Sequence, residues 1–147
     1  MIQSIKLKQP LGLKTTIINS FKNIKSNDNT LNNWIQRDIM SLYTGESFKN
    51  KLVKVVNKHY NWNTKPQQWS CIAHRVEGSI EEHEDNESKT VFLFPIKTSS
   101  KTKIVVEHKE LLLKDKQCIR FNDYNRHYLE STENSISIFV TLSFDSL

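Results

Sequence analysis

Apolar residues in the first sixty positions recur at intervals of three and four. These intervals hold over residues 13–24, 31–42 and 48–60, and such spacing places apolar side chains along one face of a helix. The sequence therefore predicts three amphipathic helices, preceded by a short strand-like alternation over 2–7. Their apolar faces are expected to pack into the core.

From Trp69 onward the apolar period changes to two. Short runs rich in Val, Ile, Phe and Thr lie at 69–76, 90–96, 102–107, 111–113, 117–121 and 135–143. A period of two with many β-branched residues is typical of strands. Because helices come first and strands last, the order predicts an α+β fold in one domain, with a mainly helical part over 1–65 and a β core over 66–147.

Length, charge and cysteine content narrow the class of protein. The chain has 147 residues and a net charge of +5. Its dispersed lysines favour an anionic substrate over a nucleic-acid partner. Cys71 and Cys118 show neither C-x-x-C nor zinc-ribbon spacing, so reduced thiols in the cytoplasm are expected. No segment approaches the roughly 20 apolar residues of a membrane span, so neither export nor a membrane anchor is expected.

His83 and Asp85 form a His-x-Asp pair inside the acidic stretch 81–89. If this pair ends a strand, the two side chains share a face and can converge on one ion, because successive side chains of a strand alternate. A second pair with the same spacing, His108-Lys-Glu110, is also present. The spacing of two residues therefore does not choose the site by itself.

His127 favours the first pair over the second. It follows Asp85 by 42 residues, which leaves room for about four strands of ~5–6 residues and a return to the same site. Only 17 residues separate it from Glu110, which suits a simple meander. Two imidazoles and one carboxylate leave three positions of an octahedral ferrous ion open. His83, Asp85 and His127 are thus predicted as metal ligands and catalytic residues.

With these residues identified, the chain resembles the 2-oxoglutarate- and iron-dependent oxygenase superfamily. The resemblance rests on the dyad region 78–86, on 121–127 and on the last strand-like run 136–142; Phe121-Asn-Asp is also similar to the aspartyl/asparaginyl β-hydroxylases. It implies a double-stranded β-helix core of the jelly-roll or cupin type, braced by the N-terminal helices. It further implies Fe(II), 2-oxoglutarate and dioxygen, with hydroxylation of an unidentified substrate such as a protein side chain.

The resemblance departs from the family at the co-substrate clamp. Many members carry an Arg, often as Arg-x-Ser, on the last core strand to pair with the far carboxylate of 2-oxoglutarate, whereas this chain has Ser135-Ile-Ser137. A buried carboxylate without a partner costs several kcal/mol. In some branches a lysine on an earlier strand takes this role, so Lys97 is the predicted replacement, with Arg75 and Arg120 in reserve. Ser137 is a further candidate contact for the co-substrate.

Two other interpretations stay open. A cupin-like metal protein that does not use 2-oxoglutarate would account for the missing arginine, although cupins usually offer three His and a Glu, and Asp85 stands at the second His. A catalytically silent binding module would keep the fold without the co-substrate. The sequence does not identify a substrate.

Overall fold

The computed structural model describes residues 2–7, 9–10, 12–22, 33–36, 39–67, 69–85, 89–99, 101–114 and 117–145. Two helices and eleven strands are formed by these residues. In chain order they are β1 (Gln3–Ile5), α1 (Leu13–Lys22), β2 (Asn33–Gln36), β3 (Ile39–Tyr43), α2 (Glu46–Tyr60), β4 (Cys71–Glu77), β5 (Ile80–His83), β6 (Lys89–Lys97), β7 (Lys103–Val106), β8 (Lys109–Leu112), β9 (Cys118–Asn122), β10 (His127–Glu130) and β11 (Ile136–Asp145).

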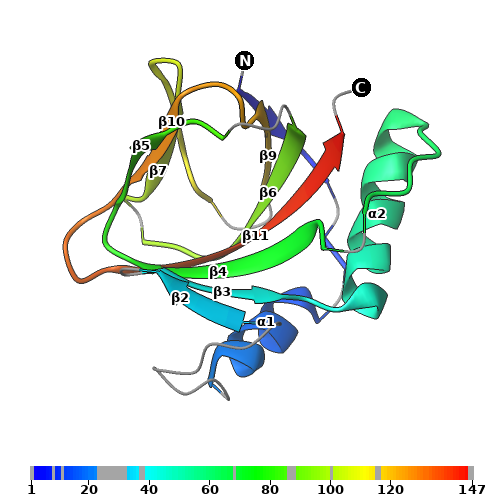
Figure 1. Ribbon diagram of the computed structural model, residues 1–147, viewed down its shortest axis with the longest axis horizontal. Helices are drawn as coiled ribbons and strands as arrows, with labels where there is room; N and C mark the ends of the chain where they lie inside the picture. The colour runs from blue at the N-terminus through cyan, green and yellow to red at the C-terminus, as the bar shows by residue number, and fades with distance from the viewer. Residues whose placement is uncertain are drawn as a thin grey trace.

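The strands form two antiparallel sheets. The larger has the order β1-β9-β6-β11-β4-β3-β2, and the smaller has the order β5-β10-β7-β8. From β4 onward the chain crosses repeatedly between the two sheets, as Figure 1 shows. Two facing sheets linked in this way make a jelly roll, or double-stranded β-helix. The predicted fold class is therefore confirmed.

Two apolar cores lie on opposite faces of the larger sheet. One joins the sheet to both helices and includes Ile17, Leu52 and Val140. The other fills the space between the two sheets and includes Leu93 of β6 and Phe139 of β11. Because neighbours along a strand alternate in direction, each strand of the larger sheet has a helix-side face and an inter-sheet face.

Both helices form for the reasons that the sequence suggests. Leu13, Ile17 and Phe21 recur every four residues and are the buried residues of α1. Helix α2 follows Gly45, whose φ of 88° favours glycine, and ends at Asn61 in the left-handed conformation, a common way to stop a helix. The first and third predicted helices are thus confirmed.

The predicted helix over 31–42 is wrong. Residues 33–36 and 39–43 form the hairpin β2–β3, and β3 pairs along β4 from Ile39 opposite Val76 to Tyr43 opposite Ile72. The edge of β4 offers backbone hydrogen bonds to a chain rich in β-branched and aromatic residues, and this pairing outweighs the helical spacing of the apolar positions. The N-terminal half thus extends the larger sheet as well as covering it.

The strand predictions in the second half are mostly confirmed. All six predicted runs correspond to strands. A strand also leads into the His-x-Asp pair, but β5 ends at His83, so Asp85 lies two residues beyond the strand and not on it. The short strand β10 was not predicted, because four residues beginning with His127 give too little alternation. No helix among the described residues has the length and apolar character needed to cross a membrane.

Candidate metal centre

The first two strands of the smaller sheet bring His83, Asp85 and His127 together. His83 is the last residue of β5, Asp85 lies two residues beyond it, and His127 is the first residue of β10. His83 and His127 are direct partners in the antiparallel register, so their side chains leave the sheet on the same side. That side is the inter-sheet face, because the His127 ring lies 5.1 Å from the ring of Phe121 in the inter-sheet core.

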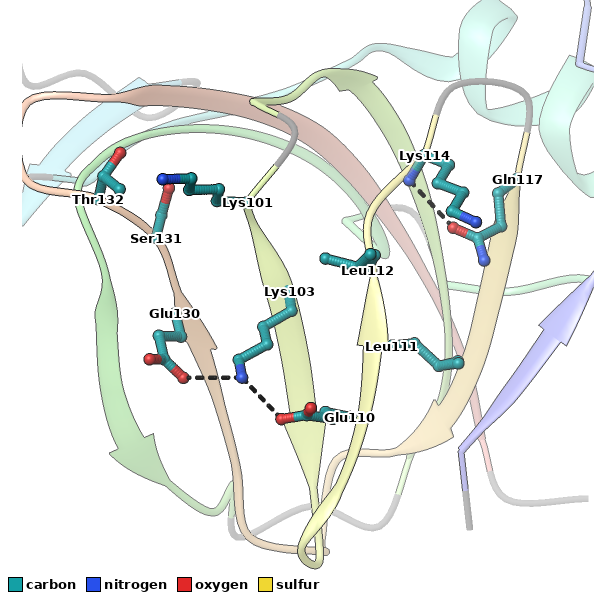
Figure 2. Close-up of a pocket in the computed structure, with 10 residues that line it drawn as sticks. All are labelled: Lys101, Lys103, Glu110, Leu111, Leu112, Lys114, Gln117, Glu130, Ser131 and Thr132. Atoms are coloured by element: carbon teal, nitrogen blue, oxygen red, sulfur yellow. Dashed lines mark hydrogen bonds and ion pairs between the residues drawn. The ribbon is translucent and has the colours of Figure 1, made fainter.

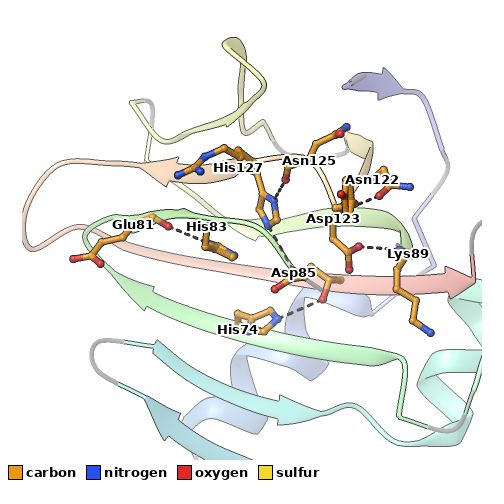
Figure 3. Close-up of polar contacts among 12 residues, drawn as sticks. His74, Glu81, His83, Asp85, Lys89, Asn122, Asp123, Asn125 and His127 are labelled. Atoms are coloured by element: carbon orange, nitrogen blue, oxygen red, sulfur yellow. Dashed lines mark hydrogen bonds and ion pairs between the residues drawn. The ribbon is translucent and has the colours of Figure 1, made fainter. Parts of the chain in front are cut away.

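The three side chains are close enough to share one ion. One potential ligand atom from each lies within 4.8 Å of the other two, and His127 Nε2 is 3.8 Å from Asp85 Oδ2. The two imidazole centroids are 4.3 Å apart, and Figure 3 shows the three side chains converging. Among the described residues, no other group of His, Cys and carboxylate side chains is arranged to hold a metal.

Backbone carbonyl groups orient both imidazoles for metal binding. His83 Nδ1 donates to the carbonyl oxygen of Glu81 at 2.8 Å, and His127 Nδ1 donates to that of Asn125 at 2.7 Å. A carbonyl oxygen only accepts, so each Nδ1 carries the proton and each Nε2 keeps its lone pair. Metal-binding histidines are usually held in this way. The donor set and its orientation fit a ferrous ion.

Burial favours the neutral form of His127, the more buried of the predicted ligands. The His127 side chain is only 10% exposed, whereas Asp85 is 52% exposed. Burial is the main cause that lowers the pKa of His127, and nearby His83 acts in the same direction, while the Asn125 carbonyl and Asp85 oppose it. The neutral imidazole is the form that binds a metal. One side of the triad is therefore packed and the other faces solvent.

Asp123 holds the segment that carries Asp85. The Asp85 N–H donates to the Asp123 carbonyl oxygen at 3.0 Å, and Asp123 Oδ1 accepts from the Lys89 N–H at 2.8 Å. The Asp123 N–H donates in turn to the Lys89 carbonyl oxygen at 3.1 Å. These bonds fix both ends of the connection between β5 and β6. The sequence offered only a resemblance around Phe121-Asn-Asp as a hint of this role.

The second His-x-acid pair is not part of a metal group among the described residues. His108 is exposed in the turn between β7 and β8, with a positive φ of 70°. Glu110 forms an ion pair with Lys103 at 2.7 Å. Of the two pairs, the one separated from His127 by the longer stretch of chain, His83 and Asp85, is therefore the pair that lies close to His127.

The predicted cations of the co-substrate clamp do not lie with the triad. Arg75 and Lys97 are cross-strand partners of Ile138, which belongs to the helix-side core, so the register places both on the helix-side face. Lys97 is exposed at the end of β6. The Arg120 guanidinium lies 5.0 Å from the Tyr60 ring centroid, on the same side as α2.

Ser137 lies on the inter-sheet face, like the triad. It is fully buried, and its hydroxyl oxygen is 3.3 Å from Thr102 Oγ1. Thr102 Oγ1 is also 2.8 Å from the hydroxyl oxygens of Ser99 and Ser131. A network of hydroxyl groups thus occupies the region of β11 where the family pattern has an arginine.

A wide groove runs along the solvent side of the smaller sheet, and Figure 2 shows its lining. Lys103 lies at its centre and pairs with Glu110 at 2.7 Å and Glu130 at 3.5 Å. Glu130 follows inward-facing Leu129, so it points away from the inter-sheet core. The groove therefore lies on the other face of the smaller sheet from His127.

No family model matches the sequence, and no curated protein matches it. Solved structures do match its fold. A prolyl hydroxylase from Trichoplax adhaerens, in complex with a hypoxia inducible factor oxygen degradation domain peptide fragment, has a TM-score of 0.64 and 12% identity, over 98% of this chain and 83% of that one. A non-haem α-ketoglutarate-dependent epimerase from nogalamycin biosynthesis has a TM-score of 0.68 and 6% identity, over 98% and 78%.

An oxidoreductase of the 2OG-Fe(II) oxygenase family from Burkholderia pseudomallei is also similar, with a TM-score of 0.60 and 9% identity, over 88% of this chain and 76% of that one. At such identities the likeness concerns the fold. The chain therefore has the double-stranded β-helix fold found in these oxygenases, with a His-Asp-His group in its smaller sheet.

Proposed function

We propose that the protein is an Fe(II)- and 2-oxoglutarate-dependent oxygenase that hydroxylates its substrate. The observation that carries this proposal is the convergence of His83, Asp85 and His127, with both Nε2 lone pairs directed away from their carbonyl partners. Two imidazoles and one carboxylate on one face are the ligand set of non-haem iron oxygenases. The fold shared with such enzymes supports the same assignment.

Each residue has a distinct part in this proposal. A ferrous ion held by His83, Asp85 and His127, together with 2-oxoglutarate, would supply the activation of dioxygen needed to oxidise a C–H bond. Asp85 contributes a negative charge, and the histidines contribute neutral nitrogen ligands. Phe121, packed at 5.1 Å from His127, excludes water behind that ligand. The exposed side of the triad, next to Asp85, leaves room for a substrate to approach.

A protein side chain is the first class of substrate to examine. One structural neighbour is bound to a peptide fragment. In this chain, Tyr124 is 61% exposed close to His127 in the sequence, and exposed Arg126 pairs with Glu82 at 3.4 Å. These exposed groups, close to His83 and His127 in the sequence, offer an aromatic surface and charges to an extended peptide.

The cysteines support a reducing cytoplasmic location. Cys71 and Cys118 are both free and buried. Free buried thiols are ordinary in intracellular proteins, whereas secreted domains of this size often pair theirs.

An anaerobic titration tests the proposal. Folded protein loaded with Fe(II) should develop a weak visible charge-transfer band on addition of 2-oxoglutarate, and His127→Ala protein should not. His59→Ala serves as the matched control, because His59 is exposed on α2. Failure of folded, iron-loaded wild-type protein to give the band would contradict the proposed use of 2-oxoglutarate.

A metal protein that does not use 2-oxoglutarate is the second candidate. It is favoured by one observation, the placement of Arg75 and Lys97 on the helix-side face. Iron binding without the band would support it. Absence of any metal binding would instead support a catalytically silent module of the same fold.

A further inference from the structure

One imidazole lies on the inter-sheet face outside the triad. His74 of β4 is the direct partner of Phe139 in β11, and their ring centroids are 5.2 Å apart. Phe139 belongs to the inter-sheet core, so His74 faces the same space as His127. Along the described inter-sheet positions of β4, which are 72, 74 and 76, it is the only ionisable side chain.

Two hydroxyl groups flank the His74 ring. Its Nδ1 is 2.8 Å from Ser41 Oγ, a short contact that fixes the ring. Its Nε2 is 3.4 Å from Thr141 Oγ1, near the limit of a hydrogen bond. The Thr141 hydroxyl donates to the Ile72 carbonyl oxygen at 3.5 Å, which is also close to that limit. The Nε2 edge and the Thr141 hydroxyl are thus loosely engaged and can turn to a ligand.

The strand register relates this pair to the triad. Phe121, which contacts His127, pairs with Val91, and Val91 pairs with Ser143 of β11. Thr141 is the next residue of β11 after Ser143 that faces the inter-sheet space, and strand geometry places it about 7 Å from Ser143 along the strand. His74 and Thr141 thus face the inter-sheet space into which a five-carbon dicarboxylate would extend if its keto acid end chelated the metal.

We infer that His74 and Thr141 bind the second carboxylate of 2-oxoglutarate, in place of the lysine or arginine of related oxygenases. The inference rests on the proposed function. Nε2–H of His74 and the Thr141 hydroxyl donate to the two carboxylate oxygens, while the Ser41 hydroxyl donates to Nδ1 and holds the ring in that tautomer. Hydrogen bonds to a charged acceptor are stronger than those between neutral groups.

A histidine also suits the ligand-free state. Burial lowers the pKa of His74 to about 4, so the free ring is neutral at pH 7. An arginine or lysine at this part-buried position would be a charge without a partner whenever the co-substrate is absent. The imidazole provides a donor for the carboxylate without that cost.

Calorimetry with Co(II)-loaded protein tests the inference through binding alone. His74→Phe keeps the packing against Phe139 and removes both ring nitrogens, and Thr141→Val removes only the hydroxyl. We expect His74→Phe to weaken 2-oxoglutarate binding at least tenfold and Thr141→Val several-fold. Co(II) affinity should stay within twofold, and the exposed His59→Phe should behave as wild type.

A monocarboxylate analogue separates direct contact from structural damage. 2-Oxopentanoate has the same chain length and the same keto acid end, but no second carboxylate. Its affinity should be equal in wild-type and His74→Phe protein. Equal 2-oxoglutarate affinities in wild type and His74→Phe, or equal losses for both ligands, would overturn the inference and leave the proposed function intact. Wild-type protein that binds Co(II) but not 2-oxoglutarate would overturn both.

Discussion

His83 and His127 are direct cross-strand partners, with imidazole centroids 4.3 Å apart and ring planes at 60°. Their separation is set by the hydrogen-bonded pairing of β5 and β10 rather than by a long loop. Sites built on paired strands are positioned more accurately than sites on loops. The metal site is therefore expected to be formed before a metal binds.

Removal of one ligand should abolish tight metal binding. His83→Ala or His127→Ala leaves two donors, and the loss of Co(II) affinity should exceed the roughly 10–100-fold that outer partners of metal ligands contribute. His108→Ala is the matched control, because His108 also belongs to a His-x-acid pair but lies exposed in the β7–β8 turn. Metal analysis after gel filtration would measure the effect. Equal metal content in all three variants would refute the assignment.

Asp123 should support metal binding through Asp85. Asp123→Ala removes the acceptor of the Lys89 N–H and should weaken Co(II) binding about tenfold or more. Asp123→Asn keeps an oxygen acceptor and should restore most of the affinity. A loss of the same size in both variants would mean that the negative charge, and not this hydrogen bond, is what matters.

The sequence predicted the triad better than it predicted the N-terminal half. A His-x-Asp pair and a histidine 42 residues later follow from strand periodicity and the number of strands needed to return to one site. The structure brings these three side chains together, while metal binding itself stays a prediction. The apolar spacing of 31–42 predicts a helix, but the pairing of β3 along the edge of β4 makes this region part of a sheet.

The clamp residues show a second limit of sequence reasoning. Position along the chain favours Lys97 and Arg75, but the face on which a strand residue lies depends on the register of the pairing. The irregular pairing between Ile138 and Phe139 leaves Lys97 opposite Ile138 rather than on the inter-sheet face. His74 carried no distinguishing spacing, so only its contacts with Ser41 and Thr141 reveal it.

Acid should destabilise the metal-free protein partly through His74. Its pKa is about 4 in the folded protein and 6.5 ordinarily, so the unfolded chain binds the proton first. Stability should fall by on the order of 3 kcal/mol as the pH drops from about 6.5 to about 4, and the lowered pKa of His127 acts in the same direction. Urea unfolding at pH 7.5 and 4.5 measures the change.

His74→Phe should show a smaller loss of stability over the same pH range, because the titrating group is gone. His59→Phe, on the exposed side of α2, should lose as much unfolding free energy as wild type over this pH range. If the free energy of unfolding changes equally with pH in wild type and His74→Phe, the lowered pKa of His74 is not what makes the protein sensitive to acid.

Both cysteines should resist thiol reagents until the protein unfolds. Burial raises the pKa of Cys71 to about 11 and raises that of Cys118 further, and the thiolate is the reactive form. Labelling with a chromogenic disulfide at pH 8 should be slow for native protein and rapid in denaturant. Rapid labelling of native protein would contradict the packing around β4 and β9.

A crystal soaked in Mn(II) and measured for anomalous scattering tests the iron-site assignment most directly. The structure predicts one strong anomalous peak at coordination distance from His83 Nε2, His127 Nε2 and an Asp85 carboxylate oxygen, with further ligand positions open toward solvent. A crystal with no peak among these atoms, or with its only ordered ion elsewhere, would contradict the assignment.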